Sequence, residues 1–287
     1  MHRTEHLLAT ALDHQTGPER VIRAPAQYWL LIVMWIRSVL AYPASFVLML
    51  VSSTLVNLTD FVAVLIMFSH ITAFGGFSLG EMALLYATSS TALGMADLLT
   101  GSIERVGERI RTGAFDAYLI RPVPAFLQAA ADGFALRRLG RPLQAGTVLV
   151  FALSKVDIDW TVARGIMLAV SLVTGTVIFA ALFVLGASFQ FVAIDSAELA
   201  NSVTYGGQAL TQFPLTVFGK EIVRAVTFVV PLAFVNYYPV LYVLGKPAPL
   251  GLPSWIGLLS PLVAAVMVAL SSLAWRAGLR RYRSTGS

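Results

Sequence analysis

The chain has 287 residues, of which 57% are hydrophobic and only 12% are charged. This balance excludes an ordinary soluble domain, in which about a quarter of the residues are charged. The net charge of +5 does not indicate nucleic-acid binding, because the arginines are confined to a few patches without interleaved aromatic residues. The absence of cysteine from the sequence excludes disulfides and thiolate metal sites.

Residues 1–24 are polar and carry acidic residues among their basic ones. They lack the compact apolar region of a cleavable secretory signal. We therefore expect residues 1–24 to form a cytoplasmic tail, followed by a single transmembrane domain over residues 25–287.

The first apolar run, residues 26–69, is too long for one membrane span. As one helix it would reach about 66 Å, roughly twice the hydrocarbon core of a bilayer. We expect the run to break at Pro43, since proline interrupts a helix, and residues 44–68 then fit one span. Residues 26–42 are short for a span and contain residues of the kinds that favour the headgroup layer: Tyr28, Trp29, Trp35, Arg37 and Tyr42. We expect an interfacial helix there, lying along the cytoplasmic surface.

Further apolar stretches predict four more complete spans, at residues 79–101, 142–156, 164–191 and 255–275. Residues 199–219 and 222–244 are less regular, because they carry several amide, hydroxyl and proline residues. We expect one of these two segments to cross the membrane fully. The other is expected to form a re-entrant helical hairpin within residues 220–250, bent at Pro231 or Pro239, since a broken backbone at membrane depth must be covered by protein or water.

Basic residues set the orientation of the spans. The segment from Gly101 to Pro142, called the arginine segment below, holds seven of the 20 Lys and Arg residues. Basic residues near span ends are retained on the cytoplasmic side. Six spans with both termini inside place 15 of the 20 basic residues on that side, whereas one or two further spans expose a basic cluster outside. The sequence therefore predicts an all-α polytopic membrane protein with six transmembrane helices and a cytoplasmic loop at residues 102–141.

Groups for catalysis are scarce in this chain. The four histidines, His2, His6, His14 and His70, lie in the first quarter of the sequence, which argues against a Ser–His dyad or a multi-histidine metal site. The G-x-x-x-x-G-K-[ST] phosphate loop is absent from the sequence, so ATP is not bound by that route. We expect no enzyme activity and no cofactor bound by this chain, and its energy must come from an ion gradient or from a separate ATPase.

A short amphipathic helix is predicted inside the arginine segment. Its pattern combines a glycine that allows a bend, an acid for the first turn, apolar and basic residues, and a proline that ends the helix: Gly113, Asp116, Phe115, Leu119, Arg121 and Pro122. Such a helix could insert its apolar side into a groove of a cytoplasmic partner, with Asp116 and Arg121 orienting it. Equally, it could be an interfacial helix that only obeys the charge topology.

Three motifs resemble those of ABC-2-type transporter permeases of the short six-span branch. They are Gly113-x-Phe115-Asp116-x-x-Leu119-x-Arg121-Pro122, Pro231-x-x-Phe234-x-Asn236-Tyr237-x-Pro239, and the ending that starts Trp275-Arg276-x-Gly278-Leu279-Arg280-Arg281-Tyr282. They occur in register along nearly the whole chain, from about residue 26. Residues 138–142 depart from the pattern, because they are richer in arginine than this branch leads one to expect.

The resemblance implies a permease subunit of an ATP-driven exporter, with the ABC-2 or type V exporter fold. Residues 26–42 would be the connecting helix, residues 107–121 would contain the coupling helix that docks on a separate ATPase subunit, and residues 222–244 would be re-entrant helices. Two ATPase subunits, which bind ATP and Mg, and two permease subunits, identical or related, would form the transporter in a bacterial cell membrane. The expected partners are these subunits and membrane lipids, and no nucleic acid.

Polar residues inside the expected spans are further candidates. Asn57 and Asp60 lie three residues apart on one helical face, and Asp97 belongs to the next span. An intramembrane acid is costly, so it faces a partner or water, or it pairs with polar groups on neighbouring helices. Another polar stripe of near-helical spacing consists of Asn201, Thr204, Gln208 and Thr211. This stripe predicts either the substrate path or the contact between two permeases.

The alternative function is a proton-coupled secondary transporter, in which Asp60 or Asp97 would carry the proton. A membrane scaffold that transports nothing is a third possibility. Stimulated ATP hydrolysis by a bound partner would favour the exporter over both.

Overall fold

The computed structural model describes residues 18–282, with side chains from residue 26 onward. These residues form helices and turns, and the described part of the chain contains no β-strand beyond an isolated bridge between Phe74 and Phe77. Most of the tail expected at residues 1–24 lies outside the described residues, and so do residues 283–287 at the end of the C-terminal motif.

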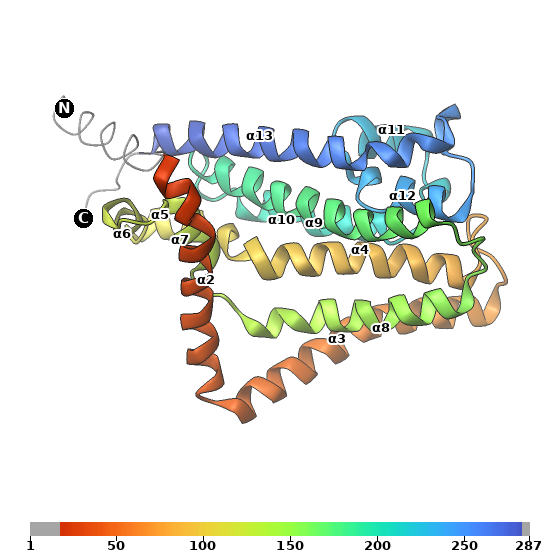
Figure 1. Ribbon diagram of the computed structural model, residues 1–287, viewed down its shortest axis with the longest axis horizontal. Coiled ribbons are helices and arrows are strands. Elements are labelled where there is room, and N and C mark those ends of the chain that lie inside the picture. Colours follow the sequence, from red (N-terminus) through yellow and green to blue (C-terminus); the bar gives the residue numbers. More distant parts are fainter. Residues whose placement is uncertain (1–17, 283–287) are drawn as a thin grey trace.

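Six helices of the described chain run side by side along the long axis of the molecule (Figure 1). They are α3 (Pro43–His70), α4 (Leu79–Thr100), α8 (Gly140–Lys155), α9 (Val162–Gln190), α10 (Ala197–Thr211) and α13 (Ser260–Arg281). α4 lies inside the bundle, where it contacts α8, α9 and α10. α3 packs mainly on α8 and is the most peripheral of the apolar helices.

Four stretches of the described chain are long and apolar enough to cross a bilayer. They are Pro43–His70, Leu79–Arg111, Val162–Gln190 and Ser254–Arg281. α8 with 16 residues and α10 with 15 residues are shorter, because they reach about 24 Å and 22 Å against the ~30 Å of a bilayer core. The protein is therefore an all-α, multi-pass membrane protein, and the six spans expected from the sequence remain a prediction.

α2 (Pro18–Leu40) runs across one end of the long helices instead of along them (Figure 1). The chain turns at residues 41–42, and α3 begins at Pro43, the position at which the sequence predicts a break. α2 begins earlier than residue 26, the start expected for the interfacial helix, so part of the expected tail is helical.

The two sides of α2 have different surroundings. One side contains buried Ile32, which packs with Phe134 and Leu136 of the arginine segment. The opposite side exposes the large side chains of Leu30 and Met34, and Trp29 is exposed at the edge between the two sides. A helix that packs on protein on one side, exposes apolar side chains on the other and carries an exposed tryptophan is suited to a membrane surface.

Glycine lets α4 approach α8 closely at two points. A Cβ atom on Gly80 would lie 2.9 Å from the backbone carbonyl carbon of Lys155, and one on Gly94 would lie 2.8 Å from Cδ of Pro142. Both distances are shorter than a real contact allows, so a larger residue would push the two helices apart. This close packing helps to make α4 the most buried of the four candidate spans.

The chain between α10 and α13 is broken into short helices at the end of the molecule opposite α2 (Figure 1). They are η3 (Leu215–Val217), α11 (Lys220–Phe228), η4 (Leu232–Phe234), α12 (Tyr237–Leu244), η5 (Pro249–Gly251) and η6 (Ser254–Leu259). The chain bends between α11 and α12 near Pro231, whereas Pro239 lies within the first turn of α12. Neither of the two irregular segments, 199–219 and 222–244, forms one uninterrupted helix of span length.

Candidate functional site

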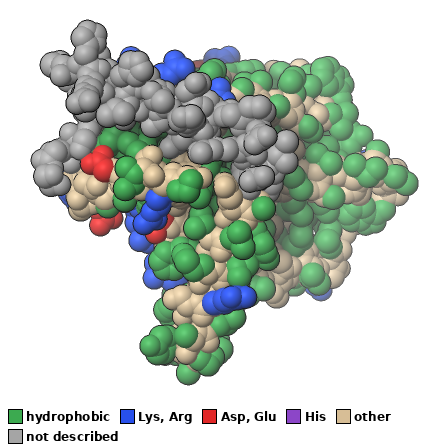
Figure 2. All heavy atoms as spheres, turned by 60° about the vertical axis from the view of Figure 1, so that its left-hand side comes forward, with side chains coloured by type: hydrophobic (Ala, Val, Ile, Leu, Met, Phe, Trp, Pro, Cys, Tyr) green, Lys and Arg blue, Asp and Glu red, His purple; other side chains and the backbone are tan. Residues whose placement is uncertain are grey.

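The arginine segment folds into short helices at the same end of the molecule as α2 (Figure 1). They are η1 (Gly101–Arg105), α5 (Val106–Arg111), α6 (Asp116–Ile120), α7 (Ala125–Ala131) and η2 (Leu136–Leu139). Figure 2 turns this end forward and shows Lys and Arg side chains on it, whereas hydrophobic side chains cover the more distant part of the surface. The basic residues that cluster in the arginine segment of the sequence thus lie together at one end of the folded protein, next to a largely hydrophobic surface.

The turn before α6 depends on Gly113. Its φ of +74° is a left-handed conformation that favours glycine. The N–H of Gly113 donates to the carbonyl of Ile110 at 3.1 Å, and the N–H of Phe115 donates to the carbonyl of Arg109 at 3.0 Å. The helix that the sequence predicts here is only five residues long, and these hydrogen bonds tie the turn before it to α5.

Phe115 fastens α6 to the rest of the protein. Its side chain is fully buried, and the ring centroids of Tyr118, Phe191 and Tyr282 lie 5.6, 5.3 and 5.0 Å from its own. Phe191 follows the last residue of α9, and Tyr282 follows the last residue of α13. We call these four aromatic residues the aromatic clamp, and it joins α6 to the ends of two long helices.

Asp116 also binds within the chain. Its Oδ1 accepts a hydrogen bond from the hydroxyl of Tyr282 at 2.6 Å. Burial, together with this hydrogen bond to Asp116, raises the pKa of Tyr282 above its ordinary value. Leu119 is half-buried and packs against the main core. Both residues therefore help to hold α6 in place.

The exposed part of α6 is its C-terminal tip. Ile120 is 86% exposed, and Arg121 and Pro122, which follow it, are exposed as well. Arg121 and Pro122 belong to the motif that the sequence singles out, whereas Ile120 does not. The helical spacing of the sequence could have identified Ile120 as exposed. Phe115 and Leu119 are four residues apart and share one side of the helix, whereas Ile120 lies on a different side from the one that they bury.

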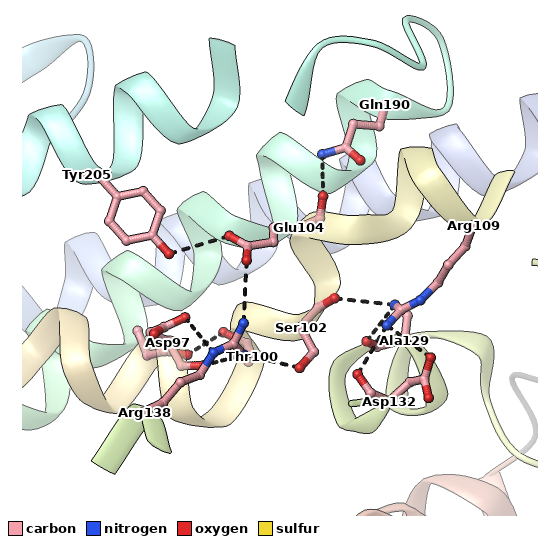
Figure 3. Close-up of polar contacts among 11 residues, drawn as sticks. Asp97, Thr100, Ser102, Glu104, Arg109, Ala129, Asp132, Arg138, Gln190 and Tyr205 are labelled. Atoms are coloured by element: carbon pink, nitrogen blue, oxygen red, sulfur yellow. Dashed lines mark hydrogen bonds and ion pairs between the residues drawn. The ribbon is translucent and has the colours of Figure 1, made fainter. Parts of the chain in front are cut away.

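Arg109 holds α5 against α7. Its buried guanidinium donates to the backbone carbonyls of Ser102, Ala129 and Asp132 at 3.1–3.3 Å (Figure 3). It also pairs with Oδ2 of Asp132 at 3.0 Å, and the same oxygen accepts a hydrogen bond from the hydroxyl of Tyr118 at 2.6 Å. Burial and this hydrogen bond raise the pKa of Tyr118. Arg109 and Asp132 are not among the residues predicted from the sequence, because no motif links two positions so far apart.

Arg138 lies between two carboxylates at the end of α4 (Figure 3). Its Nε is 3.3 Å from Oδ1 of Asp97, and its Nη2 is 3.4 Å from Oε1 of Glu104. Its Nη1 donates to the carbonyl of Asp97 at 3.2 Å and to Oγ of Ser102 at 3.1 Å. The hydroxyl of Tyr205, on α10, donates to Oε2 of Glu104 at 3.4 Å. Asp97, a candidate for the pathway or for a permease contact, is thus paired inside the chain.

Gln190, the last residue of α9, joins α9 to this cluster (Figure 3). Its Nε2 donates to the carbonyl of Glu104 at 3.0 Å, and its Oε1 accepts from the N–H of Gly107 at 2.5 Å. A Cβ atom on Gly107 would lie 2.4 Å from the carbonyl oxygen of Ile194, so the close approach of the two segments requires glycine. Glu104 therefore contacts α9 through its backbone and η2 and α10 through its carboxylate.

A family model described as ABC-2 family transporter protein matches residues 54–286, which is most of the chain. The chain belongs to this family. A search of curated proteins gives no match, and a search of solved structures gives none either. The family predicted from the sequence is thereby confirmed, and the protein is a permease-type membrane component of a transporter, from a family without an ATPase of its own.

Within the part of the permease that the structure describes, no group of three or more His, Asp and Glu side chains is placed to hold a metal ion. The clusters of charge described above pair acids with arginines instead.

The polar stripe of α10 faces the inside of the permease. Of its members, the structure buries Thr204, Gln208 and Thr211 and leaves Asn201 half-buried. Oγ1 of Thr211 lies 2.7 Å from Oγ of Ser89, and Nε2 of Gln208 donates to Oγ of Ser90 at 3.5 Å. Both serines belong to α4, so the stripe forms a polar seam inside the subunit.

Asn236 extends this seam to the bend between α11 and α12. It is fully buried, and its Nδ2 donates to the carbonyls of Leu85 and Thr211 at 2.8 Å and 2.9 Å. The sequence motif contains Asn236, but only the structure shows that it ties the bend to α4 and α10.

Asn57 and Asp60 share α3 but differ in their surroundings. Oδ1 of Asn57 accepts from Nε of Arg141 at 2.9 Å, and its carbonyl accepts from the hydroxyl of Tyr86 at 3.3 Å. Asp60 is exposed on the surface of α3. The structure therefore places Asn57 at the contact with α8 and α4, and Asp60 outside that contact.

Proposed function

We propose that this permease forms the membrane pathway of an ATP-driven exporter, and that a separate ATPase subunit, which binds ATP and Mg, drives it through the tip of α6. The observation that carries the proposal is the two-sided character of α6. The aromatic clamp buries one side, and the other end presents Ile120, Arg121 and Pro122. An exposed apolar side chain followed by an arginine fits a groove with an acidic rim on a partner.

Two sets of contacts support the transmission of movement from α6 into the membrane. The aromatic clamp connects α6 to α9 and α13. The second set starts at Glu104, which Gln190 of α9 and Tyr205 of α10 both contact. Because these contacts are packed and at least partly buried, a displacement of α6 would shift the ends of α9 and α13, and the contacts of Glu104 would connect the movement of α9 to α10.

The proposal places the arginine segment, α2 and both termini on the cytoplasmic side of a bacterial cell membrane. The crossings would be made by α3, α4, α8, α9, α10 and α13, with α11 and α12 as the re-entrant hairpin on the outside. The support is positional, because the arginine segment and α2 share one end of the bundle and basic residues are retained inside.

A second permease, identical or related, would cover the outward surface of α3. Only 11% of the most apolar stretch of α3 is buried, and Asp60 is exposed on it. A carboxylate facing lipid tails is costly, so this surface requires protein or a water-filled path. The polar stripe of α10 is already covered by α4, which leaves α3 as the better candidate for the contact.

The proton-coupled alternative rests on the same exposed Asp60. Its other candidate, Asp97, is bound to Arg138, which argues for a structural role. If the alternative holds, a proton gradient drives transport without an ATPase and Asp60→Asn abolishes it.

The proposal is tested by isolating the permease from its native membrane and assaying the bound material for ATP hydrolysis. An ATPase should co-purify with the wild-type permease. The double variant Ile120→Asp with Arg121→Glu should still be found in the membrane, but most of the ATPase should no longer co-purify with it. Lys155→Glu, an exposed change at the opposite end of the bundle, is the matched control. Equal ATPase recovery from the wild type and the α6 pair would refute the docking site.

The orientation has its own test, because the sequence contains no cysteine. An Arg121→Cys variant should resist an impermeant thiol reagent in intact cells and react in opened membranes. Labelling in intact cells would place α6 on the outer side of the membrane and contradict its docking on a cytoplasmic ATPase.

A further inference from the structure

A groove lies between α11 and the turn at η5, at the end of the bundle opposite the arginine segment. Its volume is about 1010 Å³, and most of its lining is apolar, including Leu215, Val223, Phe228, Leu250 and Leu252. An apolar groove of this size in a membrane protein is large enough to take part of a lipid chain.

The groove reaches the apolar surface of the protein. Phe228, which lines it, is 67% exposed, and the neighbouring Val229, which also lines it, is 79% exposed. Large apolar side chains exposed next to each other mark a surface that lipid or protein covers. At the same end of the bundle, Trp160 and Trp255 are exposed, and tryptophan is typical of the headgroup layer. The groove therefore opens where chains and headgroups of a bilayer meet.

Charge at the groove favours an anion. Lys220 and Arg224 line it one helical turn apart on α11. Glu221 lines it too and pairs with Arg224 at 2.8 Å, so the three side chains leave a net charge of +1. Cationic side chains at a membrane surface attract anionic headgroups.

We propose that this groove binds an anionic phospholipid of the adjacent leaflet. One acyl chain lies along Val223, Phe228 and Leu252, and the phosphate lies beside Lys220 and Arg224. A soluble anion does not account for the apolar lining, and the net charge of +1 at the groove favours a lipid of net negative charge over a zwitterionic one. The proposal does not depend on the ATPase partner or on the direction of transport.

The test compares thermal unfolding of the purified permease in detergent with added phosphatidylglycerol and with added phosphatidylcholine. Phosphatidylglycerol should raise the unfolding temperature by roughly 5 °C more than phosphatidylcholine does, because a lipid that binds only the folded state stabilises it. The variants are Lys220→Glu with Arg224→Glu, which reverses the charge, and Ala225→Trp, which fills the groove from an exposed lining position. Each variant is compared with its own lipid-free unfolding temperature, so a change in basal stability does not obscure the result.

Both variants should lose the specific effect of phosphatidylglycerol, while Lys155→Glu, an exposed charge reversal at the same end of the bundle, should keep it. Equal shifts with the two lipids in the wild type would overturn the anionic specificity. If charge reversal abolishes the specific stabilisation by phosphatidylglycerol but Ala225→Trp leaves it unchanged, the lipid is attracted only to the charged surface of α11. The groove is then not the binding site. If Ala225→Trp instead separates a permease pair without touching the lipid effect, the groove belongs to a protein contact.

Discussion

Arg109 and Arg138 each carry a positive charge to a site that the protein buries. A buried guanidinium costs free energy unless its N–H groups are paired. Arg109 meets this condition mostly with backbone carbonyls, whereas Arg138 relies on the carboxylates of Asp97 and Glu104. Arg109 therefore holds the arginine segment together, and Arg138 ties the segment to α4.

Replacing Arg138 should be costly because it leaves two carboxylates without their cation. We expect Arg138→Met to lower the free energy of unfolding by roughly 3 kcal/mol, the cost of breaking a buried ion pair. Thermal unfolding in detergent measures the loss. Adding Asp97→Asn to Arg138→Met should restore part of it, since the buried charge is removed with its partner. Additive losses from the two changes would show that Asp97 and Arg138 do not interact.

The hydrogen bond from Tyr282 to Asp116 predicts a dependence on alkaline pH. Burial and the bond to Asp116 raise the pKa of Tyr282 above its ordinary value. The contribution of this tyrosine to stability is therefore complete below about pH 10, its pKa in the unfolded chain, and is lost as the pH rises through the higher folded value. The measurement is the difference in unfolding temperature between the wild type and Tyr282→Phe at pH 8 and at pH 11.

At pH 8, Tyr282→Phe should be the less stable protein, by roughly 1.5–3 kcal/mol for a hydrogen bond to a carboxylate. At pH 11 the gap should narrow, because Tyr282 then ionises in the unfolded wild type and stabilises that unfolded state, whereas the Tyr282→Phe variant has no group to ionise there. The other tyrosines and the lysines titrate in both proteins and cancel in the comparison. A gap that widens at pH 11 would contradict the assigned bond.

α6 shows why an element can be located from a local pattern while its surroundings cannot. Gly113 marks the turn before the helix and Pro122 follows its end, and both are visible in the sequence. The sequence also suggests an apolar side for a partner, but Phe115 meets Phe191 and Tyr282 of the same chain. These contacts join positions far apart in the sequence, so spacing alone does not reveal them.

In the spans, too, the sequence predicts local features but not the contacts between distant residues. Pro43 interrupts the first apolar run locally, and the structure begins α3 there. For Asp97, the sequence leaves open a partner, water or a neighbouring helix, and only the fold brings Arg138 within 3.3 Å of it. The polar stripe of α10 is likewise visible as a stripe, but its cover by Ser89 and Ser90 of α4 is a product of packing.

The aromatic clamp should matter for coupling more than for partner binding. Phe115→Ala removes a fully buried ring and should lower the free energy of unfolding by about 3–5 kcal/mol. Ile120 stays exposed at the tip in this variant, so the ATPase should still co-purify while transport per ATP hydrolysed falls. Ile120→Ala, at the exposed tip of α6, is the control for stability alone and should leave the free energy of unfolding nearly unchanged. Full transport by Phe115→Ala at normal membrane levels would exclude the clamp as the link.

For the whole molecule, α3 is the helix that the single chain leaves least covered. The other candidate spans bury between 28% and 78% of their apolar stretches, against 11% for α3. Low burial alone is compatible with lipid, which solvates apolar side chains. Asp60 changes this conclusion, because it lies about 15 Å from the nearer end of α3 and so at a depth where lipid offers a carboxylate no partner.

The surface of α3 around Asp60 should therefore touch a second permease, and the absence of cysteine from the sequence makes this testable. Val56 is 68% exposed and lies one turn from Asp60 on the same helix. A Val56→Cys variant should form a disulfide-linked pair when membranes are oxidised, with itself in a homodimer or with a cysteine placed in a related permease. Val173→Cys, on the exposed side of α9, is the control and should stay single. A helix surrounded only by lipid forms no specific pair, so disulfide linkage reports a specific contact. Linkage through Val173→Cys without linkage through Val56→Cys would place the permease contact on α9 instead of α3, and Asp60 would then face a water-filled path.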